Sequence, residues 1–232
     1  MPTIDATNVG TVQNTGFTWI GATWTSVRDA TSGTADLTSD GTDLGVSDYI
    51  ARGANWWLVH RVFARFATAS ISTAPSDATL KIYGRANPSY MNNADFFVVR
   101  GTQGTGDPSA ADYDAITGWD TSTAADGSGA GDQESNITKY SNEWVNGTTA
   151  WDESDYNEIA LNPTALAHMA SLDNFYICII ESVHDLRDVS ETHNSVNGMY
   201  FDDNAGKEMQ IDYTAGVAAS TADNAVFFGT NF

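Results

Sequence analysis

Apolar and polar residues alternate with a period of two in two runs between residues 57 and 84, which predicts two β-strands with one face toward a core. The loop 67–77 joins these strands, and Pro75 blocks their continuation because proline has no N–H group to donate to a sheet. Ile71 is the only large apolar residue of this loop, so we expect it to pack beneath the strands. The inward positions are expected to be Leu58, His60, Val62, Ala64, Phe66, Ala78, Leu80 and Ile82.

The rest of the chain predicts further strands and one short helix. Asn162 suits a helix N-cap and Pro163 the first helical position, and Leu166 and Met169 would then face inward. Residues 175–180 are apolar on both faces, as in a central strand. Other strands are expected at 17–27, at 96–99 and in a hairpin over 198–213.

A chain of 232 residues with this patterning is most simply one all-β domain, a β-sandwich with one short helix and long loops. Within it we expect an N-terminal arm at 1–16, a long loop insertion at 101–157 and a C-terminal tail at 215–232. Loops of this length are usually functional or partly structured, so the insertion is expected to carry part of any specific surface. The tail is apolar, and we expect it to contact another subunit or a capsid through Val226, Phe227, Phe228 and Phe232.

The two strands around Pro75 also carry a resemblance. Their sequence is similar to the core of the DNRLRE-type domain, a jelly-roll β-sandwich of bacterial surface proteins and phage structural proteins. Ser72 stands where that family usually has proline, and no literal DNRLRE string occurs. The resemblance spans roughly residues 17–214 and implies a jelly-roll fold, without implying a reaction. The matching residues are Arg61, Phe63, Phe66, Ser70, Ile71, Ala78, Leu80, Ile82 and Tyr83.

The formal net charge is −20 and the sequence pI is about 4.1. Nucleic acid and anionic lipid would repel such a chain, so neither is expected as a partner. An acidic surface poor in lysine suits halophilic or marine conditions, where cations screen the self-repulsion. Cys178 is the only cysteine, and within its apolar run we expect a buried hydrophobe rather than a disulfide. The first ten residues have neither a basic start nor an apolar run, so we expect no secretory signal.

The usual catalytic signatures are missing from the sequence, and we do not expect an enzyme. Clusters of aspartate offer the hard oxygen ligands that calcium prefers, although none follows the twelve-residue calcium loop. The alternative, which we favour, is that these are solvated turn residues. No other cofactor is expected. The calcium candidates are Asp36, Asp40, Asp43, Asp126 and Asp132.

Two groups of residues are candidates for binding. Trp119, Trp144 and Trp151 lie among polar residues, where each ring either meets a ligand or anchors its own loop. Basic and aromatic side chains are expected together on the outer face of the first two core strands. The alternative, which we favour, is that these bases pair with neighbouring acids, or that the second half of the chain covers this face. The face comprises Arg61, Phe63, Arg65, Lys81 and Tyr83.

These observations lead to two hypotheses. The first is a non-enzymatic virion structural protein, such as a capsid decoration, turret or tail-fibre component of a tailed virus. It would form a homo-oligomer, contact other virion proteins, and be assembled in the host cytoplasm without a signal peptide. The second is a carbohydrate-binding module or adhesin that contacts a cell-surface glycan through its aromatic residues.

Overall fold

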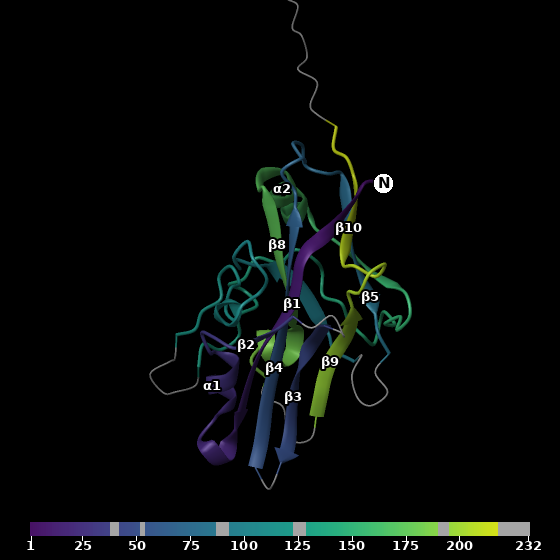
Figure 1. Cartoon of the computed structure of the whole chain (residues 1–232). Helices are drawn as coiled ribbons and strands as arrows, with labels where there is room; N and C mark the ends of the chain where they lie inside the picture. Colours follow the sequence, from purple (N-terminus) through teal and green to yellow (C-terminus); the bar gives the residue numbers. More distant parts are fainter. Residues whose placement is uncertain (38–41, 52–53, 87–92, 123–128, 190–194, 218–232) are drawn as a thin grey trace, which may run out of the picture.

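The computed structural model describes residues 1–37, 42–51, 54–86, 93–122, 129–189 and 195–217. For Trp19 and for residues 42–51, 54–55 and 195–196 it describes the backbone alone. Strands dominate the described part of the chain, and the helices are short (Figure 1). The strands are β1 (Thr3–Phe17), β2 (Thr34–Asp36), β3 (Thr42–Ala51), β4 (Ala54–Ala67), β5 (Asp77–Gly84), β6 (Phe96–Arg100), β7 (Tyr156–Ala160), β8 (Asn174–Glu181), β9 (Ser195–Asp202) and β10 (Gln210–Thr214). The helices are α1 (Trp24–Arg28), α2 (Pro163–Ser171), the 3-10 turns η1 (Thr18–Ile20) and η2 (Ala110–Asp112), and the π-helical turn η3 (Ser182–Leu186).

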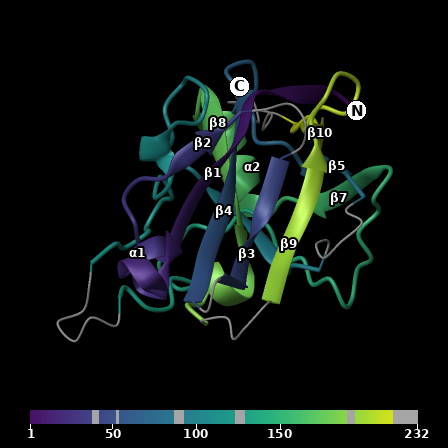
Figure 2. The same cartoon turned by 60° about the horizontal axis from the view of Figure 1, so that its bottom comes forward.

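The ten strands form one antiparallel sheet in the order β2-β1-β10-β5-β9-β3-β4-β8-β6, with β7 on the free edge of β5. An additional pairing of β1 with β4 curls this sheet back on itself. Strands β4, β3 and β9 lie side by side in Figure 2, in agreement with their hydrogen-bonded register. The predicted all-β, sandwich-like fold class is therefore confirmed.

Strand β4 is the centre of the sheet. One of its edges pairs with β1 from Phe17↔Trp56 to Ala6↔Phe66. Its other edge is divided, because β3 pairs with the first half and β8 with the second half. Residues 1–16 were expected to form an N-terminal arm. Most of them belong instead to strand β1 of the sheet.

The main core fills the concave side of the curled sheet. Val62, Phe66, Leu80 and Ile82 are at most 1% exposed, as the alternation predicted. Burial of each such side chain stabilises the fold by about 1.5–3 kcal/mol. Ile71, from the loop between β4 and β5, also joins this core, as expected.

Helix α2 closes one end of the main core, and the sequence-based prediction of this helix is confirmed. The side chain of Asn162 accepts a hydrogen bond from the Ala165 amide at 3.1 Å, and Pro163 occupies the first turn. Met169 is fully buried, and Leu166 packs against the core while partly exposed. None of the described helices is long and apolar enough to cross a membrane.

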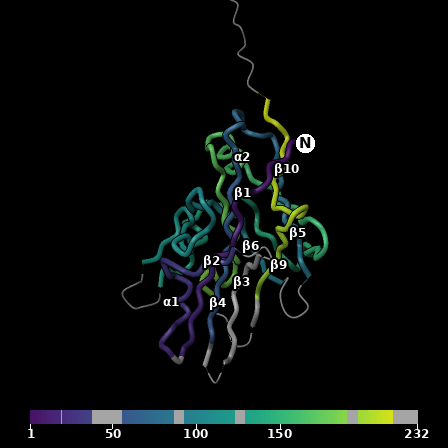
Figure 3. The backbone as a smooth tube through the Cα atoms, in the orientation of Figure 1, coloured from purple at the N-terminus to yellow at the C-terminus, as the bar shows by residue number. Residues whose placement is uncertain are grey.

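A second core lies on the opposite face of β4, β8 and β6. Phe63, Val99 and Cys178 are fully buried there. Helix α1 and the loop that follows β6 cover them, and this loop runs beside α1 in Figure 3. The central strands are therefore buried on both faces, and the layer over the outer face is largely irregular chain. The outer positions Arg61 and Phe63 of β4 are therefore interior, in agreement with the alternative in which the second half of the chain covers this face.

Residues 17–27 were expected as a strand, but only Phe17 belongs to one, at the end of β1, and the chain then forms η1 and α1. Thr23 caps α1 through its side chain, which accepts a hydrogen bond from the Ser26 amide, and the Thr23 amide in turn donates to Oγ of Ser26. This capping box satisfies amides that the helix itself leaves unpaired. It outweighs the β propensity of the tryptophan and threonine residues.

The predicted hairpin over 198–213 is wrong. Strands β9 and β10 do not pair with each other, because both pair with the same edge of β5. Strand β9 pairs at Tyr83 and Gly84, and β10 pairs with residues 77–81. The intervening turn is held by its own bonds, since Lys207 contacts Asp202 at 2.7 Å. The turn therefore carries the chain further along the same edge of β5 and does not reverse its direction.

Candidate functional site

The tryptophans of the long loop are not exposed platforms. Trp144 and Trp151 are each 9% exposed and belong to the main core. The Trp144 ring stacks on Phe96 at 5.7 Å, and the Trp151 ring lies 5.5 Å from that of Phe201. Their proposed role in ligand contact is wrong, because these rings anchor the loop that carries them.

Trp119 lies over the second core, partly buried, beside two guanidinium groups. The central carbon of Arg61 is 4.1 Å from the centre of its ring, and that of Arg28 is 5.0 Å away. Such cation–π contacts are strengthened where water is excluded. Trp119 thus also anchors its own loop.

Arg61 is completely buried and makes several hydrogen bonds. Its Nε and Nη2 donate to the two carboxylate oxygens of Asp185 at 2.8 and 2.7 Å. Nη1 donates to the carbonyl oxygen of Tyr113 at 2.7 Å, and Nη2 also donates to that of Arg28 at 3.0 Å. Burial alone would lower the pKa of Arg61, but the Asp185 carboxylate more than compensates, and the pKa lies above its usual value. Arg61 is therefore a buried cation that ties β4 to η3 and to the loop.

Arg28 extends this network from α1. Its guanidinium donates to the carboxylate of Asp29 at 2.6 Å and to the carbonyl oxygens of Gly131 and Leu186 at 2.8 and 3.2 Å. Together with Arg61, it holds α1, the long loop and η3 against the outer face of the sheet. Sequence patterning missed this role because both residues look like ordinary surface bases.

Glu181, the last residue of β8, caps the π-helical turn. Its carboxylate accepts hydrogen bonds from the amides of Val183, His184 and Asp185 at 3.0, 2.6 and 2.9 Å, and from Nδ2 of Asn197 at 3.0 Å. Burial raises the pKa of Glu181 to about 8 despite these donors. Because Glu181 and Asp185 are fully buried, solutes do not reach either carboxylate.

The remaining basic and aromatic candidates do not form one face. Phe63 is buried in the second core, and Arg65 contacts Asn8 and Asn174 through side-chain hydrogen bonds of 2.8 and 3.3 Å. Lys81 and Tyr83 instead lie around Tyr156, at 4.9 and 5.2 Å from its ring centre. The expected binding face of Arg61, Phe63, Arg65, Lys81 and Tyr83 is therefore split between the interior and separate surfaces.

The calcium candidates gain no support from the described part of the chain, which holds no group of three or more histidine, cysteine or acidic residues placed to bind a metal. Asp132 serves as a turn residue, accepting a hydrogen bond from the Glu134 amide at 2.7 Å. Asp36 lies in β2. The side chain of Asp43, together with Asp40, Asp126 and the tail residues Val226, Phe227, Phe228 and Phe232, lies outside the described residues.

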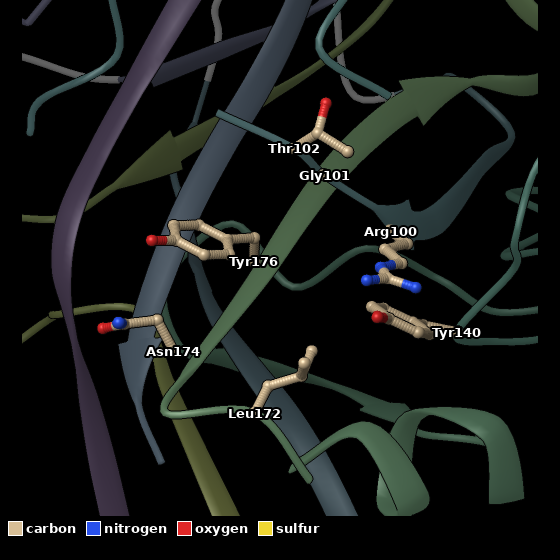
Figure 4. A pocket seen from close by; sticks show the side chains of 7 residues that line it. All are labelled: Arg100, Gly101, Thr102, Tyr140, Leu172, Asn174 and Tyr176. Atoms are coloured by element: carbon tan, nitrogen blue, oxygen red, sulfur yellow. The ribbon is translucent and has the colours of Figure 1, made fainter. Parts of the chain in front are cut away.

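A depression of about 220 Å³ lies where β6 ends beside the start of β8 (Figure 4). Arg100 and Tyr176 line it and are partly exposed. Figure 4 shows the Arg100 guanidinium beside the Tyr140 ring. The hydroxyl of Tyr140 is 2.8 Å from Nδ1 of His168 on α2. The lining residues are Arg100, Gly101, Thr102, Tyr140, Leu172, Asn174 and Tyr176.

The depression combines a cation, aromatic rings and an amide. Within the described residues, Arg100 forms no ion pair and no side-chain hydrogen bond. Burial and the positive charge of Arg100 lower the pKa of His168. No local sequence pattern indicates this site, because its members come from positions 100–102, 140 and 172–176.

No protein family matches the chain, and no curated protein sequence matches it significantly. The resemblance to the DNRLRE-type domain therefore stays a prediction.

Proposed function

We propose that the protein is a non-enzymatic virion structural subunit that forms a homo-oligomer and contacts other proteins of the particle. The observation that carries this proposal is the buried ion network of Arg61, Asp185 and Arg28. It fastens the long irregular loop to the sheet, and a fastened loop is a fixed surface suited to docking. A mobile lid over a reaction centre would need the opposite property.

The placement of the perturbed carboxylates also supports a structural role. Glu181 and Asp185 are fully buried, whereas Glu134 and Glu143 are bound to Arg187 at 2.5 and 2.7 Å. General acid–base chemistry needs a carboxyl group within reach of a substrate. These four groups are engaged in holding the chain together.

The charge of −20 makes a specific prediction about assembly. Like-charged subunits repel one another over about 10 Å at 0.1 M salt and over about 3 Å at 1 M salt. We expect an oligomer that is favoured at high ionic strength. Sedimentation velocity of the recombinant chain at micromolar concentration, in low and in molar sodium chloride, measures this directly.

The experiment that tests the particle assignment uses antibodies against the recombinant chain. Lysates of the cells that encode it are banded in a density gradient and probed across the fractions. Co-migration with particles that contain DNA supports the proposal. A chain found only in the soluble fractions, and monomeric in both salt conditions, overturns it.

The alternative is a carbohydrate-binding module. Contact of Trp119, Trp144 and Trp151 with a glycan is not supported, because these rings pack against the rest of the protein. The depression at Arg100 offers a different site, and one specific observation favours it: the arginine lacks an acidic partner among the described residues.

A further inference from the structure

We propose that the depression at the end of β6 binds one acidic sugar unit, a hexuronate, with Arg100 contacting the sugar carboxylate. This site is independent of the proposed structural role, because a virion subunit and a free-standing module could both carry it.

Arg100 has no acidic partner among the described residues. The described bases Arg28, Arg61, Lys81, Lys139, Arg187 and Lys207 each have a carboxylate within 4.0 Å. Arg100 has none in the described part of the chain, although acids outnumber bases 30 to 10 in the sequence. A planar guanidinium presents paired donors that match a carboxylate. A partly buried guanidinium beside a cavity is therefore available to an anionic ligand.

The exposed aromatic ring decides the ligand class. Tyr176 lines the cavity and is partly exposed, whereas Tyr140 is fully buried and stacks on Phe175 at 4.7 Å. The Tyr176 ring offers a flat apolar surface to the C–H face of a sugar ring. Inorganic phosphate or sulfate has no apolar face and would leave this ring unused. A carboxylate attached to a pyranose ring uses both the Tyr176 ring and the cation.

Asn174 adds a positioned polar group. Its side-chain oxygen accepts from Nη1 of Arg65 at 3.3 Å, while Nε of Arg65 donates to Oδ1 of Asn8 at 2.8 Å. The amide of Asn8 donates in turn to Asp107 at 2.5 Å. This relay fixes the Asn174 amide with its oxygen engaged, so its Nδ2 group remains a donor for a sugar hydroxyl. Arg65 and Asn8 act here as positioning residues.

The size of the cavity sets the length of the bound segment. About 220 Å³ is below the roughly 300–1,000 Å³ of pockets that enclose drug-sized ligands. It therefore suits one sugar unit, with neighbouring units of an oligosaccharide in solvent. Thr102 at the rim is exposed, which leaves room for the chain to continue.

Isothermal titration calorimetry with trigalacturonate tests the proposal on the full chain at low salt. We expect binding that Arg100→Gln weakens at least tenfold and Tyr176→Ala several-fold, while Tyr176→Phe retains it. Lys207→Gln is the matched control, since it removes the same charge at the turn between β9 and β10. Should Arg100→Gln not fold, Arg100→Lys serves instead, because it keeps the charge and loses the paired donors.

Several results would overturn the proposal. If a neutral trisaccharide binds as tightly as trigalacturonate, the sugar carboxylate does not contribute to binding. Inorganic phosphate that competes at equal concentration makes the site a general oxyanion site. Equal loss of binding in Lys207→Gln and Arg100→Gln assigns the effect to net charge. No detectable heat with trigalacturonate at about 10 mM rejects the site, and none of these results bears on the particle assignment.

Discussion

Arg61 on β4 and Asp185 in η3 form a bidentate ion pair in which both side chains are completely buried, with donor–acceptor distances of 2.8 and 2.7 Å. A buried pair of this kind repays its desolvation only if every remaining donor is satisfied. Here two further N–H groups of the guanidinium reach backbone carbonyls, so the pair joins the regular sheet to the irregular layer.

Removing one partner of this pair should be costly. Asp185→Asn leaves the Arg61 charge buried without its counter-charge, and we expect the free energy of unfolding to fall by about 3–5 kcal/mol. Urea denaturation followed by tryptophan fluorescence measures this loss. Asp202→Asn, which breaks the partly exposed pair with Lys207, is the control and should cost less than about 1 kcal/mol. Equal losses in the two variants would contradict the role assigned to Arg61.

Acid should destabilise the protein partly through Glu134. Hydrogen bonds from Arg187 and Lys139 lower the pKa of Glu134 from 4.5 to about 2. Since the folded pKa is depressed, its stabilisation is fully present above pH 4.5 and is lost as the pH falls toward 2. After allowance for solvent screening, we expect about 1–2 kcal/mol.

Thermal unfolding of Glu134→Gln between pH 2 and 6 checks this expectation. The variant should be less stable than the native chain at pH 6, and the difference should shrink toward pH 2. Glu158→Gln removes the same charge from the exposed side of β7 and serves as the control. A difference for Glu134→Gln that does not depend on pH would argue against the ion pair as its cause.

Glu181 should act in the opposite direction. Burial raises its pKa from 4.5 to about 8, so between these values the folded chain holds a proton that the unfolded chain has released. The stability contributed by this group therefore declines as the pH rises from 4.5 to 8. At about 1.4 kcal/mol for each pKa unit, the upper limit of the decline is about 5 kcal/mol.

The Glu181→Gln variant isolates this effect, because glutamine does not titrate. Chemical denaturation at pH 5, 6.5 and 8 should give a shallower loss of stability with pH than in the native chain. Parallel profiles for the two proteins would show that Glu181 remains ionised throughout, held by its amide donors.

The tryptophans of the long loop should affect stability. Trp151→Ala removes a ring packed against Trp144 and Phe201, and we expect a loss of about 3–5 kcal/mol. Calorimetric unfolding measures it. Val145→Ala is the comparison, since this exposed residue on the same loop should change the stability by less than about 0.5 kcal/mol. A stable Trp151→Ala protein would mean that the ring does not anchor the loop.

Local signals account for what could be predicted from the sequence. Asn162 and Pro163 begin a helix because each acts on its immediate neighbours, and Pro75 separates β4 from β5 in the same way. The inward face of β4 follows from its period of two.

The other face could not be predicted from that period. Arg61 alternates with Val62 as a solvent-facing residue would, yet chain more than a hundred positions away covers it. The depression at Arg100 is also formed only by the pairing of β6 with β8. Contacts of this kind depend on the complete fold. A period of two predicts only which side chains share a face of the strand, and it does not predict which distant part of the chain covers the other face.

The pairing of β1 with β10 has a mechanical consequence. Thr3 is opposite Asp212, and the amide of Tyr213 donates to the carbonyl of Pro2 at 3.0 Å. The polypeptide therefore enters and leaves at the same pole, as the first strand and the last strand do in Figure 1. Tension applied through both of these strands would break the backbone hydrogen bonds between β1 and β10 one pair after another. The longer pairing of β1 with β4 would bear the force only afterwards.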